Sequence, residues 1–105
     1  MRRVTIGCGV GFDRFGKQIA VLSRDVLKSA LLKVACERFG GATFIDTFGA
    51  WRDNTGKDII EPGWSIVLYT DKGDDFVKQF ALYVRNVMGQ ESVVLVVEEI
   101  AVQFV

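Results

Sequence analysis

The sequence predicts an α+β fold whose elements follow the order βαββαβ. Two amphipathic segments end at Gly40 and Gly89, as helices that stop at glycine do. Segments with alternating apolar residues stand before, between and after them. A third observation is the turn-forming sequence at residues 52–57, which separates two of these strand segments directly, as in a hairpin.

The first strand is expected over residues 3–10 and the first helix over residues 24–38. Val4, Ile6, Cys8 and Val10 share one face of the strand, and Thr5, Gly7 and Gly9 share the other. Ser23 has the side chain of a good N-cap residue, and glycines 40 and 41 stop the helix.

The second strand is expected over residues 42–51 and the third over residues 58–70. Pro62 cannot donate a hydrogen bond within a sheet, so it predicts an edge position or a bulge. A second helix follows the turn at residues 71–74 and runs to about Met88. The valine-rich residues 92–97 predict a well-buried last strand that continues through residues 100–104.

This order predicts one domain, residues 1–105, of the ferredoxin-like class: a four-stranded antiparallel sheet with two helices on one face. The composition agrees with a globular chain, since 50% of the residues are hydrophobic and 25% are charged. Thirteen basic residues balance thirteen acidic ones, so nucleic acid and anionic membranes are not expected partners. No apolar run approaches membrane-spanning length, and we expect a cytoplasmic protein.

The chain has no histidine, which removes the usual general base near neutral pH and the commonest metal ligand. Any catalysis would rest on carboxylates, tyrosine, cysteine, lysine or arginine. Cys8 and Cys36 have no metal-site spacing, so we expect free thiols, no metal and no cofactor.

A candidate ligand site follows from the order of the elements, because three connections meet at one end of such a fold. They are residues 11–21, 51–58 and 89–92. The candidate ligand-binding residues on them are Asp13, Arg14, Trp51, Arg52, Gln90, Glu91 and Ser92. The alternative is structural: the polar residues satisfy backbone groups, and Arg52 pairs with Glu91 or Asp13.

The segments 40–46, 49–52 and 89–93 resemble those of a family of small bacterial proteins catalogued as domain of unknown function 3574. The resemblance spans Val4 to Val97, implies the same fold and assigns no reaction. It also singles out Asp46 and Glu61, which with Glu91 are the candidate acids or bases. Asp46 becomes a proton-transfer candidate only if its face of the second strand is buried, and otherwise it is an ordinary solvated residue.

Glycines 7, 9 and 11 fall within a strand and lack the spacing of a dinucleotide-binding loop. A glycine face on a central strand favours close approach of a second copy. The expected homodimer interface consists of Gly7, Gly9, Trp64, Ile66 and Leu68.

The sequence therefore favours a homodimeric ligand-binding or interaction module, with an enzyme of the dimeric α/β-barrel kind as the alternative. Partner binding through Leu32, Cys36 and Phe39 is a third hypothesis. RNA binding is a weaker one, based on a partial match of residues 63–69 to a ribonucleoprotein signature.

Overall fold

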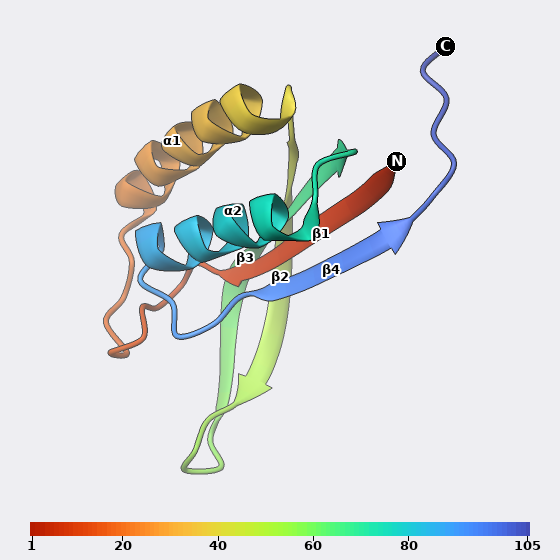
Figure 1. The fold of residues 1–105 in the computed structure, drawn as a ribbon. Coiled ribbons are helices and arrows are strands. Elements are labelled where there is room, and N and C mark those ends of the chain that lie inside the picture. The colour runs from red at the N-terminus through yellow and green to blue at the C-terminus, as the bar shows by residue number, and fades with distance from the viewer.

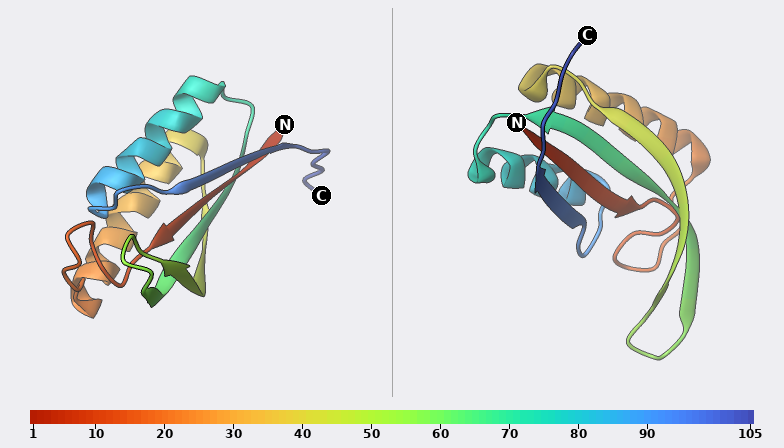
Figure 2. Two further views of the ribbon diagram at one scale, coloured as in Figure 1. Left: turned by 90° about the horizontal axis from the view of Figure 1, so that it is seen from below. Right: turned by 90° about the vertical axis from the view of Figure 1, so that its right-hand side faces the viewer.

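The computed structural model describes residues 1–105 and confirms the predicted fold class (Figure 1). The elements are β1 (Arg2–Gly9), α1 (Val21–Phe39), β2 (Thr43–Arg52), β3 (Asp58–Thr70), α2 (Asp74–Val87) and β4 (Val94–Glu99). The strands form one antiparallel sheet in the order β2-β3-β1-β4. Both helices lie on the same side of this sheet, which leaves its other face open (Figure 2). No helix combines the length and apolar character needed to cross a membrane.

The hydrophobic core lies between the helices and the covered face of the two central strands. Its members are Val4, Ile6, Cys8, Val10, Leu31, Ala35, Trp64, Ile66, Leu68, Val77, Phe80, Ala81, Val84 and Met88. Alternation in β1 works as the sequence predicts, because its four apolar residues all face the helices. Phe39 extends the core at the end of α1 by packing edge-to-face on Phe76 and Phe80.

Helix α1 begins before the predicted residue. Its N-cap is Ala20, without a side-chain cap, so Ser23 lies inside the first turn and not at the cap. The predicted end is close to the observed one, since Gly40 adopts a left-handed conformation and its N–H donates to the carbonyl of Cys36.

The prediction that Pro62 marks a sheet edge or a bulge is wrong for the bulge, while the edge holds only locally, because Pro62 lies one residue beyond the last β3 residue that pairs with β1. Pro62 lies in the interior strand β3, opposite Phe48, in an uninterrupted register. Its carbonyl accepts a hydrogen bond from the Val10 N–H. Its nitrogen therefore also points toward β1, which has already ended at Gly9, and the missing N–H removes no bond from the ladder.

The last strand is shorter and more exposed than predicted. β4 is an edge strand, and all its residues are exposed, Val94 to 64%. Residues 100–105 form no strand, although the Ile100 N–H still donates to the carbonyl of Met1. A run of β-branched residues indicates a strand but does not show that two layers cover it.

Candidate functional site

A hollow of about 300 Å³ lies on the open face of the sheet, where β1, β2 and β3 run side by side. Its floor is formed by glycines on all three strands, Gly7, Gly9, Gly49 and Gly63. The missing side chains leave open space above Gly49 and Gly7, whereas the side chains of Glu61 and Thr47 lie close over Gly9 and Gly63. Trp51, Glu61, Thr47 and Ser65 supply an aromatic ring, a carboxylate and two hydroxyls around this floor.

The Glu61 side chain is the fixed polar group of the hollow. It is 7% exposed, and one carboxylate oxygen accepts hydrogen bonds from the backbone N–H groups of Gly11 (3.0 Å) and Phe12 (3.1 Å). The other oxygen accepts the indole N–H of Trp51 at 2.9 Å. No Lys or Arg lies within ion-pair distance of Glu61. The hollow thus contains a buried, hydrogen-bonded carboxylate without a cationic partner.

The position of Glu61 depends on glycine at two places in β1 and the loop after it. A Cβ added at Gly9 would lie 2.8 Å from the Glu61 Cδ, and one added at Gly11 would lie 2.9 Å from its Cβ. By contrast, a Cβ at Gly7 would lie 3.5 Å from the Cβ of Val94, an ordinary contact. Gly9 and Gly11 are therefore needed to accommodate the glutamate.

Trp51 presents its ring to the hollow while its indole N–H is fixed by Glu61. The residue remains 52% exposed. Its hydrogen bond limits rotation of the side chain, so the ring forms a largely pre-oriented surface for a flat or cationic ligand group.

Cys8 lies under the same region, but its thiol does not act as a nucleophile near neutral pH. Burial raises the pKa of Cys8 to about 12, and the nearby Glu61 carboxylate contributes to the increase. Cys36 is exposed on α1, and both cysteines are free thiols.

The structure brings only part of the predicted ligand site together. The connection after β1 and the end of α2 do meet, since the Arg14 N–H donates to the carbonyl of Gly89 and the Gln90 side chain donates to that of Phe12. These contacts are structural. Arg14 lies over the Phe15 ring at 4.8 Å, while Glu91 and Ser92 are exposed.

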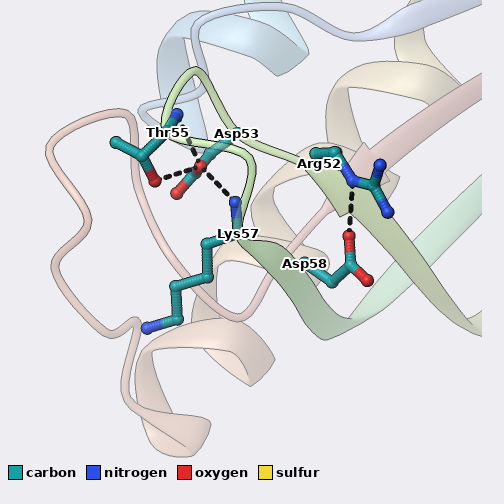
Figure 3. Close-up of polar contacts among 5 residues, drawn as sticks. All are labelled: Arg52, Asp53, Thr55, Lys57 and Asp58. Atoms are coloured by element: carbon teal, nitrogen blue, oxygen red, sulfur yellow. Dashed lines mark hydrogen bonds and ion pairs between the residues drawn. The ribbon is translucent and has the colours of Figure 1, made fainter.

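Asp13 and Asp53 perform the same local task in two loops of sequence Asp-x-x-Gly-Lys. The Asp53 carboxylate accepts the N–H groups of Thr55 and Lys57, as Figure 3 shows. Asp13 accepts those of Phe15 and Lys17 in the same pattern. The glycines, at φ +76° for Gly16 and +82° for Gly56, allow the tight reversal. Asp13 therefore closes its own loop instead of facing a ligand.

Arg52 pairs with Asp58 across the hairpin at 2.9 Å, so neither Glu91 nor Asp13 is its partner (Figure 3). This pair stands at the far end of the hairpin, which extends beyond the rest of the sheet (Figure 1).

Asp46 lies on the helix side of β2, where its carboxylate contacts the Lys28 ammonium of α1 at 3.3 Å. Its side chain is 83% exposed, so the desolvation required for a proton-transfer role is absent. The face of β2 that carries Asp46 thus points toward the helices, yet the Asp46 side chain stays solvated.

The predicted dimer interface is wrong for three of its five residues. Trp64, Ile66 and Leu68 are at most 3% exposed because they face the helices, whereas Gly7 and Gly9 lie on the open face. Buried Trp64 also removes the stacking residue on which the RNA-binding hypothesis depended. The apolar groups that do lie on the open face include Ile45, Val67, Tyr69, Val94 and Val96.

Of the third predicted surface, Cys36 is exposed, whereas Leu32 and Phe39 are half-buried. Phe39 packs within the chain, so this stripe is only partly available to a partner.

Sequence reasoning named Trp51, Glu61, Gly7 and Gly9 but assigned them to separate roles. It missed that they form one hollow. The available signal was the period-two alignment of Gly7 with Gly9 in one strand and of Glu61 with Gly63 in another, which places each pair on a single strand face.

Solved structures similar to this chain share its fold at low sequence identity. A phage SAM lyase in complex with S-methyl-5'-thioadenosine has a TM-score of 0.69 and 20% identity, over 93% of this chain and 80% of that one. CutA from Pyrococcus horikoshii has a TM-score of 0.61 and 12% identity, over 99% of this chain and 88% of that one. CutA from Synechococcus elongatus has a TM-score of 0.59 and 10% identity, over 91% of this chain and 73% of that one.

No family model matches the chain, and no curated protein matches its sequence. The resemblance to domain of unknown function 3574 therefore stays a prediction. The solved structures support the fold alone.

Proposed function

We propose that this protein binds a small adenosine-derived thioether or sulfonium compound in the hollow beside Trp51. The observation that carries the proposal is the pairing of Trp51 with buried Glu61 above a glycine floor. The fold shared with a phage SAM lyase in complex with S-methyl-5'-thioadenosine supports the choice of ligand class.

Each part of such a ligand has a matching group in the hollow. The exposed face of the Trp51 ring can stack on adenine, an interaction of about 1–3 kcal/mol per base. The hydroxyls of Thr47 and Ser65 are available to a ribose. A hollow of about 300 Å³ lies at the lower limit of ordinary small-molecule sites, so the ligand remains partly exposed in one subunit.

Glu61 favours a ligand with a positive centre. The carboxylate is buried and has hydrogen-bond donors but no cation beside it. A sulfonium group within a few ångströms gains attraction that a neutral thioether does not. We therefore expect S-adenosylmethionine, the substrate that the name SAM lyase denotes, to bind more tightly than S-methyl-5'-thioadenosine.

Binding is tested by titration calorimetry with both compounds. Trp51→Leu should weaken binding by about 5-fold to 150-fold, the range of a lost stacking contact of about 1–3 kcal/mol. Phe48→Leu is the matched control, because Phe48 is an exposed aromatic residue of the same strand on the opposite face. Equal affinities for the wild type, Trp51→Leu and Phe48→Leu would place the ligand elsewhere and contradict the proposal.

An enzymatic role is the second candidate, favoured by the same unpaired carboxylate. If the Glu61 carboxylate accepts a proton from the carbon β to the sulfonium sulfur, the C–H electrons form a C=C bond and the C–S bond breaks onto sulfur, which releases S-methyl-5'-thioadenosine and an unsaturated amino acid. Incubation with S-adenosylmethionine, followed by chromatography for S-methyl-5'-thioadenosine, tests this role. Glu61→Gln keeps the size of the side chain and should slow any such release. Tight binding without product would leave the binding module as the function.

Self-association through the open sheet face is the remaining part of the proposal. The accessible surface of the chain is 6864 Å², about 1,000 Å² more than a compact monomer of 11.7 kDa exposes. This excess is similar to the 800 Å² or so that each partner buries in a standard interface. A second copy on this face would also cover the hollow.

Light scattering coupled to size exclusion tests the dimer. Val96→Lys places a charge on the open face and should produce monomers, whereas Leu82→Lys, on α2, should not. A monomeric wild type would refute self-association and leave the ligand proposal to its own test.

A further inference from the structure

Residues 100–105 form an unpaired segment with the sequence of a strand. Ile100, Val102 and Phe104 alternate with Ala101, Gln103 and Val105, and neither proline nor glycine interrupts them. After the Ile100 N–H, no backbone or side-chain hydrogen bond involves this segment. Phe104 is 77% exposed. The segment is thus suited to pairing as a β-strand, but it pairs with no strand of its own chain.

Strand β2 supplies the complementary feature, an unpaired and unprotected sheet edge. It is ten residues long, and only β3 pairs with it. Proteins commonly protect such edges with lysine, proline or a bulge. β2 has none of these, and its two charged residues, Asp46 and Arg52, are engaged by Lys28 and Asp58 of the same chain.

We propose that residues 100–105 of one copy add as a strand to the free edge of β2 in a second copy. The inference rests on the self-association proposed above and is independent of the ligand. The occupant is a second copy because each copy carries both the free strand and the free edge, and each exposes about 1,000 Å² of surface beyond that of a compact monomer.

The direction of the segment agrees with this arrangement. Together with Arg3 and Tyr69 it surrounds a hollow of about 490 Å³. Arg3 and Tyr69 face each other on the open side of the sheet, so the segment leaves the sheet on that side. It also starts from β4, at the sheet edge opposite to β2 (Figure 2). Six extended residues span about 20 Å, which fits within the ten residues of β2.

Hydrogen exchange measured by mass spectrometry on the wild-type protein tests the inference without a variant. Above the association concentration, the amides of residues 101–105 and of β2 should exchange at least 10-fold more slowly than after dilution to monomers. An oligomer whose residues 101–105 exchange as fast as an unstructured peptide would overturn the inference and leave packing of the open faces standing. Protection that does not change on dilution would also overturn it, because the segment would then be bound within its own chain.

A pair of variants adds a second test. Val102→Pro with Gln103→Pro removes one N–H from each edge of the segment, and no hydrogen bond of the isolated chain is lost. The paired control is Val102→Ala with Gln103→Ala, which keeps both donors. The proline pair should weaken association at least 10-fold relative to the alanine pair. Equal association would overturn strand addition, and a monomeric wild type would overturn both this inference and self-association while leaving ligand binding untouched.

Discussion

The substitution Gly9→Ala tests whether the glycine floor exists to accommodate Glu61. Its Cβ would lie 2.8 Å from the Glu61 Cδ, closer than nonbonded carbon atoms approach. Gly7→Ala is the matched control, since Gly7 lies on the same strand and the same face but meets only Val94, at 3.5 Å. Neither glycine has a positive φ, so alanine strains the backbone at neither site.

The expected cost follows from what Glu61 must give up. To avoid the new methyl group, the carboxylate must leave the N–H groups of Gly11, Phe12 and Trp51. Overpacking costs about 1–3 kcal/mol, and buried donors left unsatisfied cost a similar amount. We expect Gly9→Ala to lower the free energy of unfolding by about 2–4 kcal/mol and Tm by at least about 8 °C. Gly7→Ala should be neutral, or stabilise by up to about 1 kcal/mol by restricting the unfolded chain.

Urea unfolding followed by tryptophan fluorescence measures both variants, and a double-mutant cycle identifies the cause. In a Glu61→Ala background the carboxylate that the new methyl group would meet is absent, so Gly9→Ala should cause little loss in the free energy of unfolding. The reasoning is refuted if Gly9→Ala and Gly7→Ala are equally stable within about 0.5 kcal/mol, or if the penalty is unchanged without Glu61.

Four further predictions concern single side chains. Iodoacetamide at pH 8 should modify Cys36 but not buried Cys8, with one adduct in the mass of the native protein and two after unfolding. Because the pKa of Cys8 is about 12 in the folded protein and ordinarily 9.0, the unfolded chain releases this proton first, and stability should fall as pH rises from about 9 to 12. Asp53→Ala should lower Tm, and Asp53→Asn, which keeps a hydrogen-bond acceptor, should lower it less. Hydrogen bonds from Thr55 and Lys57 hold the pKa of Asp53 below its usual value, and NMR titration should show this lowered pKa. The stabilisation that the Asp53 carboxylate provides should therefore be lost as the pH falls through its lowered pKa. Asp46→Asn should change stability by less than about 0.5 kcal/mol and leave ligand affinity unchanged, because the ion pair with Lys28 is exposed; a lost affinity would restore Asp46 as a site residue.

Local patterns in the sequence were sufficient to predict most of the elements. Alternation in residues 3–10, the glycine at position 40 and the turn formers of residues 52–57 each act through neighbouring residues, and each is found as predicted. Errors arose where the outcome depended on a distant segment. Pro62 is tolerated in an interior strand only because β1 ends beside it. Val94 and Val96 of β4 are exposed because they lie on the face of the sheet that no layer covers.

The sequence predicted several residues of the candidate site but not that they lie together in one hollow. The sequence by itself determined that β3 has two faces, one with Trp64, Ile66 and Leu68 and the other with Glu61 and Gly63, because side chains alternate along any strand. Only the tertiary structure decided which face the helices cover. That choice buries Trp64, and it places Glu61 beside Gly9, some fifty residues earlier in the chain, where Trp51 and two backbone amides can hold it. Alternation is a property of the local backbone, whereas burial of a carboxylate depends on partners that folding brings together.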